Sequence, residues 1–306
     1  MSRYFARRLA QLVPVALGVV TLTFALIHLV PGDPVVAMLG ESATPTDIEG
    51  LRQELGLDRP LLTQYGAFLA GLAVGDLGES ISQHRSVASL IRERYPATIE
   101  LAAAGLVVGM LLAFPLGIIA GARPGSAADL GAMGFAVLGI SVPHIYLGPL
   151  LMIFFSLDLG WLPLTGRGGF DHLVLPAVTL GTALAAVTAR MLRQSLVQIS
   201  GSDYLRTARS KGLSASAALL RHGLRNAITS VVTLLGLEAG ALLTGALIVE
   251  MIFSWPGIGR LLIGAISARD YPLVEGCVLA FALTYVVANM LTDALYALVD
   301  PRVRLR

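Results

Sequence analysis

Basic side chains with the chemistry to bind anionic groups gather between residues 190 and 225. Guanidinium and ammonium groups form charge-assisted hydrogen bonds with phosphates and carboxylates, and Asp203 is the one acid in this stretch. The stretch could therefore bind acidic lipid headgroups or an acidic protein surface. Its seven basic residues are Arg190, Arg193, Arg206, Arg209, Lys211, Arg221 and Arg225.

The sequence excludes ATP binding through a P-loop and predicts no catalytic residue and no metal site. A Walker A loop needs Gly-Lys-Ser or Gly-Lys-Thr, but Lys211, the one lysine of the chain, lies in Ser-Lys-Gly. ATP and Mg²⁺ that power this protein would have to be bound by another chain. An intramembrane enzyme would need a nucleophile–base pair or paired metal ligands, whereas His28, His144 and His172 are scattered and form no HExxH motif.

The composition predicts a membrane protein. Hydrophobic residues make up 55% of the chain and charged residues 14%, against about 25% charged residues in soluble domains. Because about 20 apolar residues cross a bilayer as a helix, we expect an all-α polytopic protein with six spans. Pro143 and Pro149 should kink the third of them. The spans are predicted at residues 9–30, 97–122, 130–157, 172–195, 228–253 and 273–298.

The placement of arginines predicts that both termini are cytoplasmic. With six spans, the termini, the turn at 123–129 and the stretch at 190–225 share one side and carry fourteen basic residues. The other side carries eight, five of them in residues 31–96 beside nine acids. Cytoplasmic loops are enriched in lysine and arginine, so we expect the basic stretch inside and residues 31–96 outside.

Residues 31–96 are predicted to form an extracytoplasmic helical subdomain. Thr46-x-x-Glu49 matches a capping box that would begin its first helix. Ser86 is expected to cap a later short helix that ends before Pro96, where the second span would begin. The subdomain could be an apolar cap on the membrane surface or a docking platform for an outside partner, and the sequence leaves both open.

Small residues spaced four apart predict close helix packing in two spans. Such stripes let the backbones of neighbouring helices approach each other in lipid. They are Gly105, Gly109, Gly117 and Gly121 in the second span, and Gly236, Gly240 and Thr244 in the fifth.

Glu238 lies in the middle half of the fifth span and is a candidate for the substrate pathway. A charged residue at the centre of a span costs about 2.5–3.5 kcal/mol on insertion scales, so it should face protein or water. Thr244 and Asn289 are further pathway candidates, whereas Asp293 is expected to be structural. An ion-coupled carrier is an alternative, but it would need more intramembrane ion ligands and often an inverted repeat.

The basic stretch itself is predicted to form two short helices joined by a glycine turn. Ser202 or Asp203 should cap the first helix, and Gly212 lets the backbone turn. Ser214 should cap the second helix, whose leucines at 219, 220 and 224 would lie against the membrane base. Up to this point, lipid binding and partner binding remain equally open.

The segment DYLRTARSKGL, followed by RHGLRNA, resembles the cytoplasmic EAA loop of binding-protein-dependent ABC importers. Arg206-Thr-Ala208 lies where the family has Glu-Ala-Ala, and Gly212 is the glycine of the motif. A glutamate is absent from that position, and Ser230 replaces a common proline, so neither role is carried over. Further matches in the same order are LVPGDP, LGLDRPLLTQY, GDLGES, PATIEL, GWLPLTGR, HLVLPAVTL, FSWPGIGRLL, RDYPLVEG and DPRVR.

The resemblance covers the whole chain and is to the first permease subunit of dipeptide, oligopeptide or nickel ABC importers. It implies one transmembrane domain over residues 1–306, with a type I importer (MetI-like) fold and a coupling loop at residues 200–227. It also implies a bacterial cytoplasmic-membrane protein that imports peptides by alternating access. Nickel, haem or glycan would be the alternative substrates.

The same resemblance implies partners and contact residues. The expected partners are a second homologous permease, two ABC ATPase domains, an extracytoplasmic solute-binding protein and membrane lipid, with no nucleic acid. Asp76, Trp255 and Pro256 are expected at the docking surface or gate for the binding protein. The residues expected to contact an ATPase are Tyr204, Leu205, Arg206, Ala208, Arg209, Lys211, Gly212 and Leu213.

Overall fold

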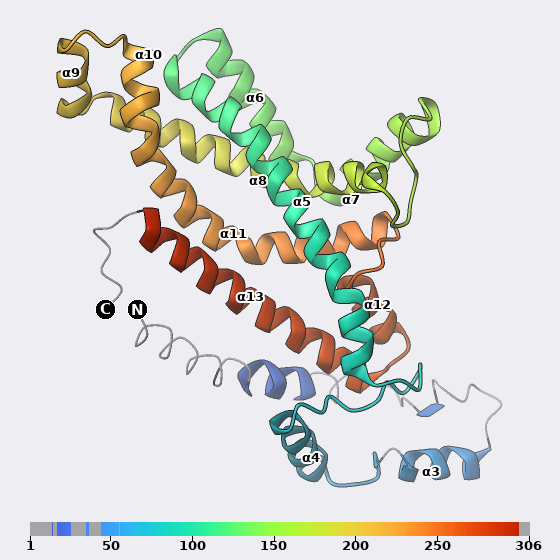
Figure 1. The fold of residues 1–306 in the computed structure, drawn as a ribbon. Helices are drawn as coiled ribbons and strands as arrows, with labels where there is room; N and C mark the ends of the chain where they lie inside the picture. Colours follow the sequence, from blue (N-terminus) through green and yellow to red (C-terminus); the bar gives the residue numbers. More distant parts are fainter. Residues whose placement is uncertain (1–13, 15–16, 26–34, 37–43, 55, 300–306) are drawn as a thin grey trace. The chain divides into compact units, whose positions relative to one another are not determined.

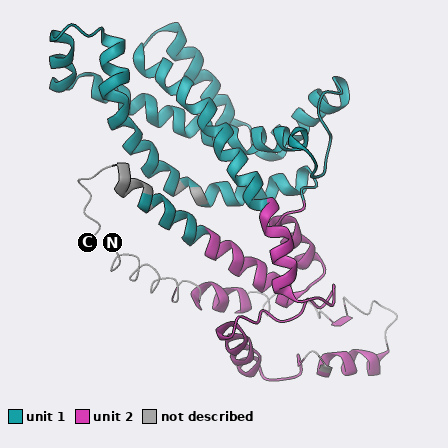
Figure 2. Ribbon diagram, viewed as in Figure 1, with its two compact units in different colours: residues 1–4, 98–255, 285–306 teal, residues 5–97, 256–284 magenta. Residues whose placement is uncertain are grey.

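The computed structural model describes residues 14, 17–25, 35–36, 44–54 and 56–299. Throughout these residues the regular structure is helical, apart from an isolated β-bridge between Glu79 and Ser86. The chain divides into two compact units (Figure 2), which are described separately. Unit 1 comprises residues 1–4, 98–255 and 285–306, and unit 2 comprises residues 5–97 and 256–284.

Unit 1 is built around the long helix α8, Phe170–Ser200 (Figure 1). Helices α6 (Ala127–Ser141) and α11 (Leu224–Ile252) pack against it. Between α6 and α8 the chain forms α7 (His144–Leu151) and the π-helix η1 (Met152–Asp158). Buried leucines and alanines run along α8, so it supplies the core on which the other helices of unit 1 assemble.

The glycine stripe in α5 (Val87–Ala122) packs closely against α8, as the sequence predicted. A Cβ atom placed on Gly105 would lie 2.7 Å from Leu180 Cδ2, and one on Gly121 would lie 2.8 Å from Leu196 Cβ. Real Cβ atoms essentially never come this close to another heavy atom. Larger side chains would therefore push the two helices apart.

Unit 2 contains α3 (Pro45–Glu54), α4 (Leu61–Ala73), α12 (Ile258–Ser267) and the first turns of α5 and of α13 (Tyr271–Val299). The cap of α3 differs from the prediction. Thr44, rather than Thr46, accepts a bond from the Asp47 amide at 3.3 Å, and the Asp47 carboxylate accepts one from the Thr44 amide at 3.2 Å. The bonds from Thr44 lower the pKa of Asp47. Pro45 fits the first helical position because that position needs no N–H donor.

The predicted short helix between Ser86 and Pro96 is wrong as a separate element. Helix α5 begins at Val87 and continues through Pro96 without a break. A proline removes one helical hydrogen bond, but the residues on both sides of it are packed, with Leu90, Ala97 and Leu101 almost fully buried. The end of the 31–96 segment is therefore the first part of the long helix.

Three helices among the described residues are long and apolar enough to cross a membrane: α5, α8 and α13. Two bent pairs could each form a further span: residues 127–141 with 144–158, and residues 215–236 with 240–252. The first predicted span, residues 9–30, lies mostly outside the described residues.

The predicted third span is broken rather than merely kinked, because its two halves meet at 104°. Val142, between them, has φ −96° and ψ 107°, an extended conformation. A proline disfavours helical geometry in the residue before it, and Pro143 follows Val142 and caps α7. The local sequence at Pro143 therefore explains the break.

Candidate functional site

The basic stretch folds as two helices separated by a glycine turn, as predicted. The first is α9 (Asp203–Ser210), and Gly212 after it has φ +95°, a region that glycine adopts without strain. Ser214 caps the next helix by accepting a bond from the Ala217 amide at 3.2 Å. That helix, α10 (Ala215–Ala218), continues through the π-helix η2 (Leu219–Gly223) directly into α11. Residues 215–252 therefore form one continuous helical element that begins after the glycine turn.

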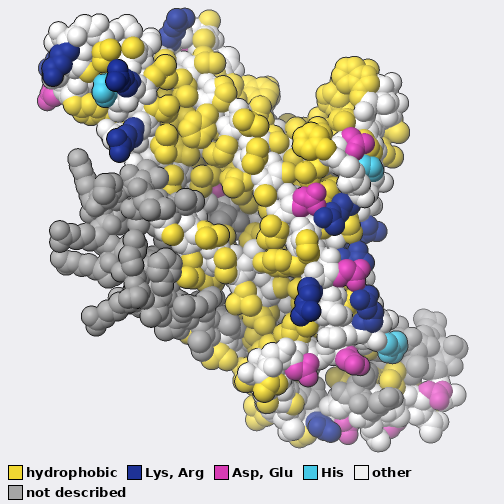
Figure 3. All heavy atoms as spheres, viewed as in Figure 1, with side chains coloured by type: hydrophobic (Ala, Val, Ile, Leu, Met, Phe, Trp, Pro, Cys, Tyr) yellow, Lys and Arg dark blue, Asp and Glu magenta, His cyan; other side chains and the backbone are white. Residues whose placement is uncertain are grey.

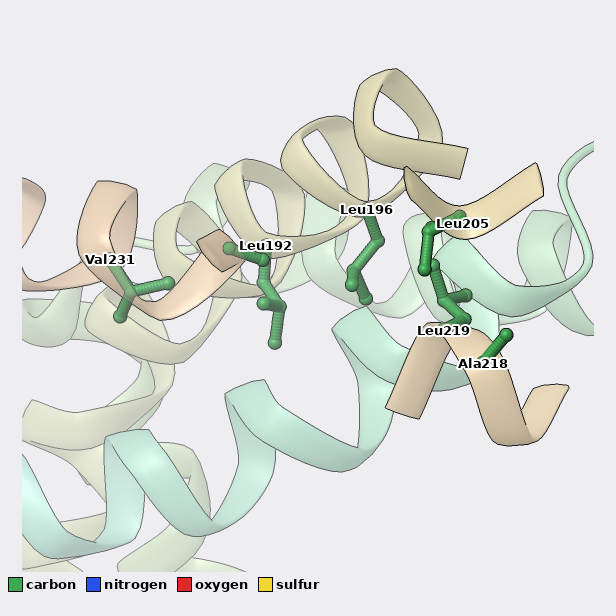
Figure 4. Packing of buried hydrophobic residues seen from close by; sticks show 7 residues of the cluster. Leu192, Leu196, Leu205, Ala218, Leu219 and Val231 are labelled. Carbon is green, nitrogen blue, oxygen red and sulfur yellow. The ribbon is translucent and has the colours of Figure 1, made fainter. Parts of the chain in front are cut away.

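Leu205 anchors α9 to the core of unit 1. Its side chain is 2% exposed and belongs to a buried apolar cluster with Leu192 and Leu196 of α8 (Figure 4). Figure 4 shows Leu205 beside Leu219, and Ala208 and Leu213 pack partly against the same cluster. The prediction that Leu205 contacts an ATPase is therefore corrected, because an apolar side chain already buried in its own chain cannot also enter a partner's groove.

The opposite face of α9 is exposed and basic. Arg206, Arg209 and Lys211 are all exposed, and Figure 3 shows Lys and Arg side chains around α9 and α10 beside a mostly hydrophobic part of unit 1. Arg206 lies 3.5 Å from Asp203, but both side chains are largely in solvent. Such an exposed pair contributes little to stability, so Arg206 remains available for a partner.

Two side chains add to this exposed face. Tyr204 is 42% exposed, and its hydroxyl accepts a hydrogen bond from Asn226 Nδ2 at 2.9 Å. Leu220 is 47% exposed, whereas the sequence placed it against the membrane base with Leu219 and Leu224. Adjacent residues of a helix point in different directions, so Leu219 can be buried while Leu220 is exposed.

The three pathway candidates do not share the cavity that Glu238 lines. Glu238 lines a cavity of about 100 Å³ in unit 1 with His144 and apolar residues of α8 and α11. It lies between Gly236 and Gly240, where α11 bends by 58°. Thr244 and Asn289 are outside that lining, and each bonds a carbonyl of its own helix, Gly240 at 3.0 Å and Tyr285 at 3.0 Å.

The small residues of the fifth span that were predicted to allow close packing do so at two of their three positions. A Cβ on Gly236 would lie 2.8 Å from Thr292 Cγ2, and one on Gly240 would lie 3.0 Å from Tyr285 Cε2. Thr244, the third member of the stripe, is exposed. Within unit 1, α11 and α13 therefore approach each other at the two glycines.

Trp255 is fully buried, so the prediction that it contacts a binding protein is corrected. The Arg167 guanidinium lies over the Trp255 ring, 5.9 Å from its centroid, and donates to Glu100 Oε2 from Nε at 2.8 Å. A large apolar ring gains more from this packing than from exposure to solvent. Trp255 therefore holds its loop in place rather than presenting a surface.

The other two candidates for docking remain accessible. Pro256 is half-buried and lines a cavity of about 350 Å³ in unit 2 with Arg94 and Arg260. Asp76 is exposed, and its Oδ1 accepts a bond from the Gly78 amide at 2.9 Å, which fixes the turn after α4.

Two buried carboxylates in unit 1 were missed by the sequence reasoning. Glu250 is fully buried and accepts a hydrogen bond from Thr98 Oγ1 at 2.6 Å. Asp129 is buried and paired with Arg193 at 2.5 Å. Both pairs join residues more than 60 positions apart, so no local pattern identifies them. For Asp129 and Arg193, the sequence signal available was the presence of opposite charges near the ends of successive apolar segments.

Two family models together cover nearly the whole chain. Residues 113–305 match the binding-protein-dependent transport system inner membrane component. Residues 1–102 match the N-terminal part of a membrane component of the same kind of system.

Curated proteins and solved structures show similarity over much or all of the chain. Glutathione transport system permease proteins GsiC from Pectobacterium atrosepticum and from Escherichia coli K12 are 43% and 42% identical, over 99% of both chains. An inward-facing MetNI methionine ABC transporter structure matches 70% of this chain and 97% of its own, with a TM-score of 0.56 and 16% identity. An amino acid ABC transporter structure matches with a TM-score of 0.51 and 18% identity, over 71% and 95%.

Proposed function

Because the chain belongs to the family of binding-protein-dependent transport system inner membrane components, in the first-permease branch of the dipeptide, oligopeptide and nickel importers, we propose that it imports small peptides. It has the all-α, MetI-like fold of type I ABC importer permeases and is a permease subunit of such an importer. Family membership does not specify the substrate, so the import of small peptides is the proposal.

The observation that carries the substrate proposal is full-length similarity. Relatives named as glutathione permeases are 42–43% identical over 99% of this chain. Glutathione is a tripeptide, so it falls within the class of small peptides. The experiment must distinguish peptide import from two competing outcomes. One is uptake of nickel, haem or a glycan, and the other is ion-coupled transport without ATP.

For coupling, we propose that the exposed face of α9 binds an ATPase subunit. Arg206, Arg209 and Lys211 would pair with acids on that subunit, while Tyr204 and Leu220 supply apolar contact area. Leu205 would transmit the motion, because it ties α9 to the buried cluster on α8. In this arrangement Ala208 and Leu213 support α9 from its inner side, and Gly212 sets its angle to α10.

The proposed complex has this permease, a second homologous permease, two ABC ATPase domains that hold ATP and Mg²⁺, and an extracytoplasmic solute-binding protein. It lies in the bacterial cytoplasmic membrane with both termini and residues 200–227 on the cytoplasmic side. Residues 31–96, with Asp76 and Pro256, would lie outside and receive the binding protein. The arginine distribution in the sequence supports this orientation.

The experiment is reconstitution of the complete complex in proteoliposomes. ATP hydrolysis and uptake are measured with the binding protein and, in turn, glutathione, a dipeptide, Ni²⁺, haem or an oligosaccharide. Stimulation by glutathione or the dipeptide supports the proposal, and stimulation by another ligand alone contradicts it. Uptake driven by a membrane potential without ATP would instead identify an ion-coupled carrier.

A further inference from the structure

Unit 2 contains a cavity of about 440 Å³ that the coupling mechanism does not use. It lies among α4, the turn that follows it and the first turn of α13. Ligand pockets in proteins commonly have volumes of about 300–1,000 Å³, so a molecule of a few amino acids could enter. The charged side chains in its lining are Arg59, Asp76, Glu79 and Glu275.

Glu275 is the most informative of these residues. Its side chain is 7% exposed yet lines the cavity, and within the described part of the chain it has neither a hydrogen bond nor an ion pair. Asp270, a buried carboxylate five residues earlier, accepts bonds from Ser80 Oγ at 2.5 Å and the Ser82 amide at 2.9 Å. A buried carboxylate without a partner is costly, so Glu275 is suited to a cationic group from outside the chain.

The arrangement of charges favours an organic ligand over a metal ion. Within the described residues, Glu275, Asp76 and Glu79 do not form a group close enough to hold a metal. Arg59, which is exposed on the same lining, adds a guanidinium that binds carboxylates. A ligand with an ammonium group at one end and a carboxylate at the other would match both the acidic and the basic side chains of the lining.

We propose that this cavity is a binding subsite for a small zwitterionic peptide, with Glu275 binding its ammonium group and Arg59 its carboxylate. Tyr271 and Phe68 lie in the same lining and supply apolar surface for the rest of the peptide. The inference rests on the proposed function in taking a peptide as ligand. By the predicted topology the subsite lies on the outer side, where a binding protein would release its cargo.

The test measures direct binding of tritiated glutathione and of N-acetylglutathione to the complete permease–ATPase complex in nanodiscs, without the binding protein. Glu275→Gln keeps the shape of the side chain and removes its charge. Because a hydrogen bond to a charged group is lost, glutathione should bind about 10-fold more weakly or worse. N-acetylglutathione, which lacks the ammonium group, should bind equally to wild type and variant.

Glu49→Gln is the matched control, because Glu49 is an exposed carboxylate of α3 that pairs with Arg52 outside the cavity. Unchanged glutathione binding in Glu275→Gln would overturn the proposal. Equal weakening for both ligands would also overturn it, because it would indicate structural damage. The affinity of each variant for the binding protein is measured separately. Weaker affinity for the binding protein with unchanged peptide affinity would assign the cavity to protein docking and overturn the proposal as well.

The binding result and the transport result are separate. If the wild-type complex transports glutathione but Glu275→Gln does not change glutathione binding, the cavity proposal fails and the proposed function stands. If the complex transports no peptide and yet glutathione binding depends on Glu275, the proposed function fails and the subsite stands.

Discussion

Arg193 of α8 forms a two-point ion pair with Asp129 of α6: Nε lies 2.5 Å from Oδ1, and Nη2 lies 2.6 Å from Oδ2. Asp129 Oδ2 also accepts a bond from the Gly125 amide at 2.8 Å. One carboxylate therefore holds the turn before α6 and joins that helix to α8. Two parallel bonds between a guanidinium and a carboxylate are among the stronger polar contacts in proteins.

Asp129→Asn should lower the melting temperature of the detergent-solubilised protein, because Arg193 loses its charged partner. Arg193→Lys should lower it less, since an ammonium keeps the charge but not the two-point geometry. Asp203→Asn is the control, because its pair with Arg206 is exposed. Equal melting temperatures for Asp129→Asn and Asp203→Asn would show that the buried pair is not stabilising.

Leu205→Ala should destabilise the permease by about 2–5 kcal/mol, the usual range for truncating a buried leucine. Leu220→Ala is a matched control at an exposed leucine and should change stability by about 0.5 kcal/mol or less. Denaturation of the permease in detergent without ATPase subunits measures both. A similar, small effect of the two substitutions would contradict the assignment of Leu205 to the core.

Arg206→Ala should leave the stability of the permease in detergent unchanged and weaken retention of the ATPase subunits during purification. The loss should be larger at low salt, because exposed charge pairs are screened as ionic strength rises. Affinity capture of the complex at two salt concentrations gives the measurement. Full retention of the ATPases in Arg206→Ala would exclude this residue from the interface.

Gly212→Ala should reduce transport per ATP hydrolysed, and Gly212→Trp should reduce it further. A Cβ at Gly212 meets no atom within 4 Å, but its φ of +95° is strained for residues with a side chain. The turn would have to change, and with it the angle between α9 and α10. Gly201→Ala, at φ −83°, is the control. Wild-type coupling in Gly212→Trp would rule out the glycine turn as part of the coupling mechanism.

Glu238→Ala should reduce substrate uptake about 10-fold while assembly with the ATPases is retained. The residue lies at the bend of α11 and lines a cavity with His144. Losing one hydrogen bond between the Glu238 carboxylate and substrate or water corresponds to a reduction of at least about 10-fold. Asp158→Asn, an exposed carboxylate at the end of η1, is the control. Normal uptake in Glu238→Ala would remove this residue from the pathway.

Much of the helical framework could be predicted from the sequence because its signals are local. Gly212 indicated a turn, Ser214 indicated a cap, and the glycines of α5 indicated a close-packed helix face. Apolar runs of about 20 residues likewise located the helices that carry the candidate spans. Composition, spacing and backbone preferences act over a few residues, so neighbouring residues are enough to reveal them.

Which side chain faces which neighbour was decided by the tertiary structure. Leu205 and Leu220 look alike in the sequence, yet one is buried against α8 and the other is exposed. Trp255 was expected at the docking surface or gate for the binding protein and is buried beneath Arg167. The unpartnered state of Glu275 likewise depends on what surrounds it in unit 2. Burial and pairing depend on atoms that are distant along the chain. Residue type and spacing therefore determined where the helices form, whereas packing determined which face of each helix is buried and which is exposed.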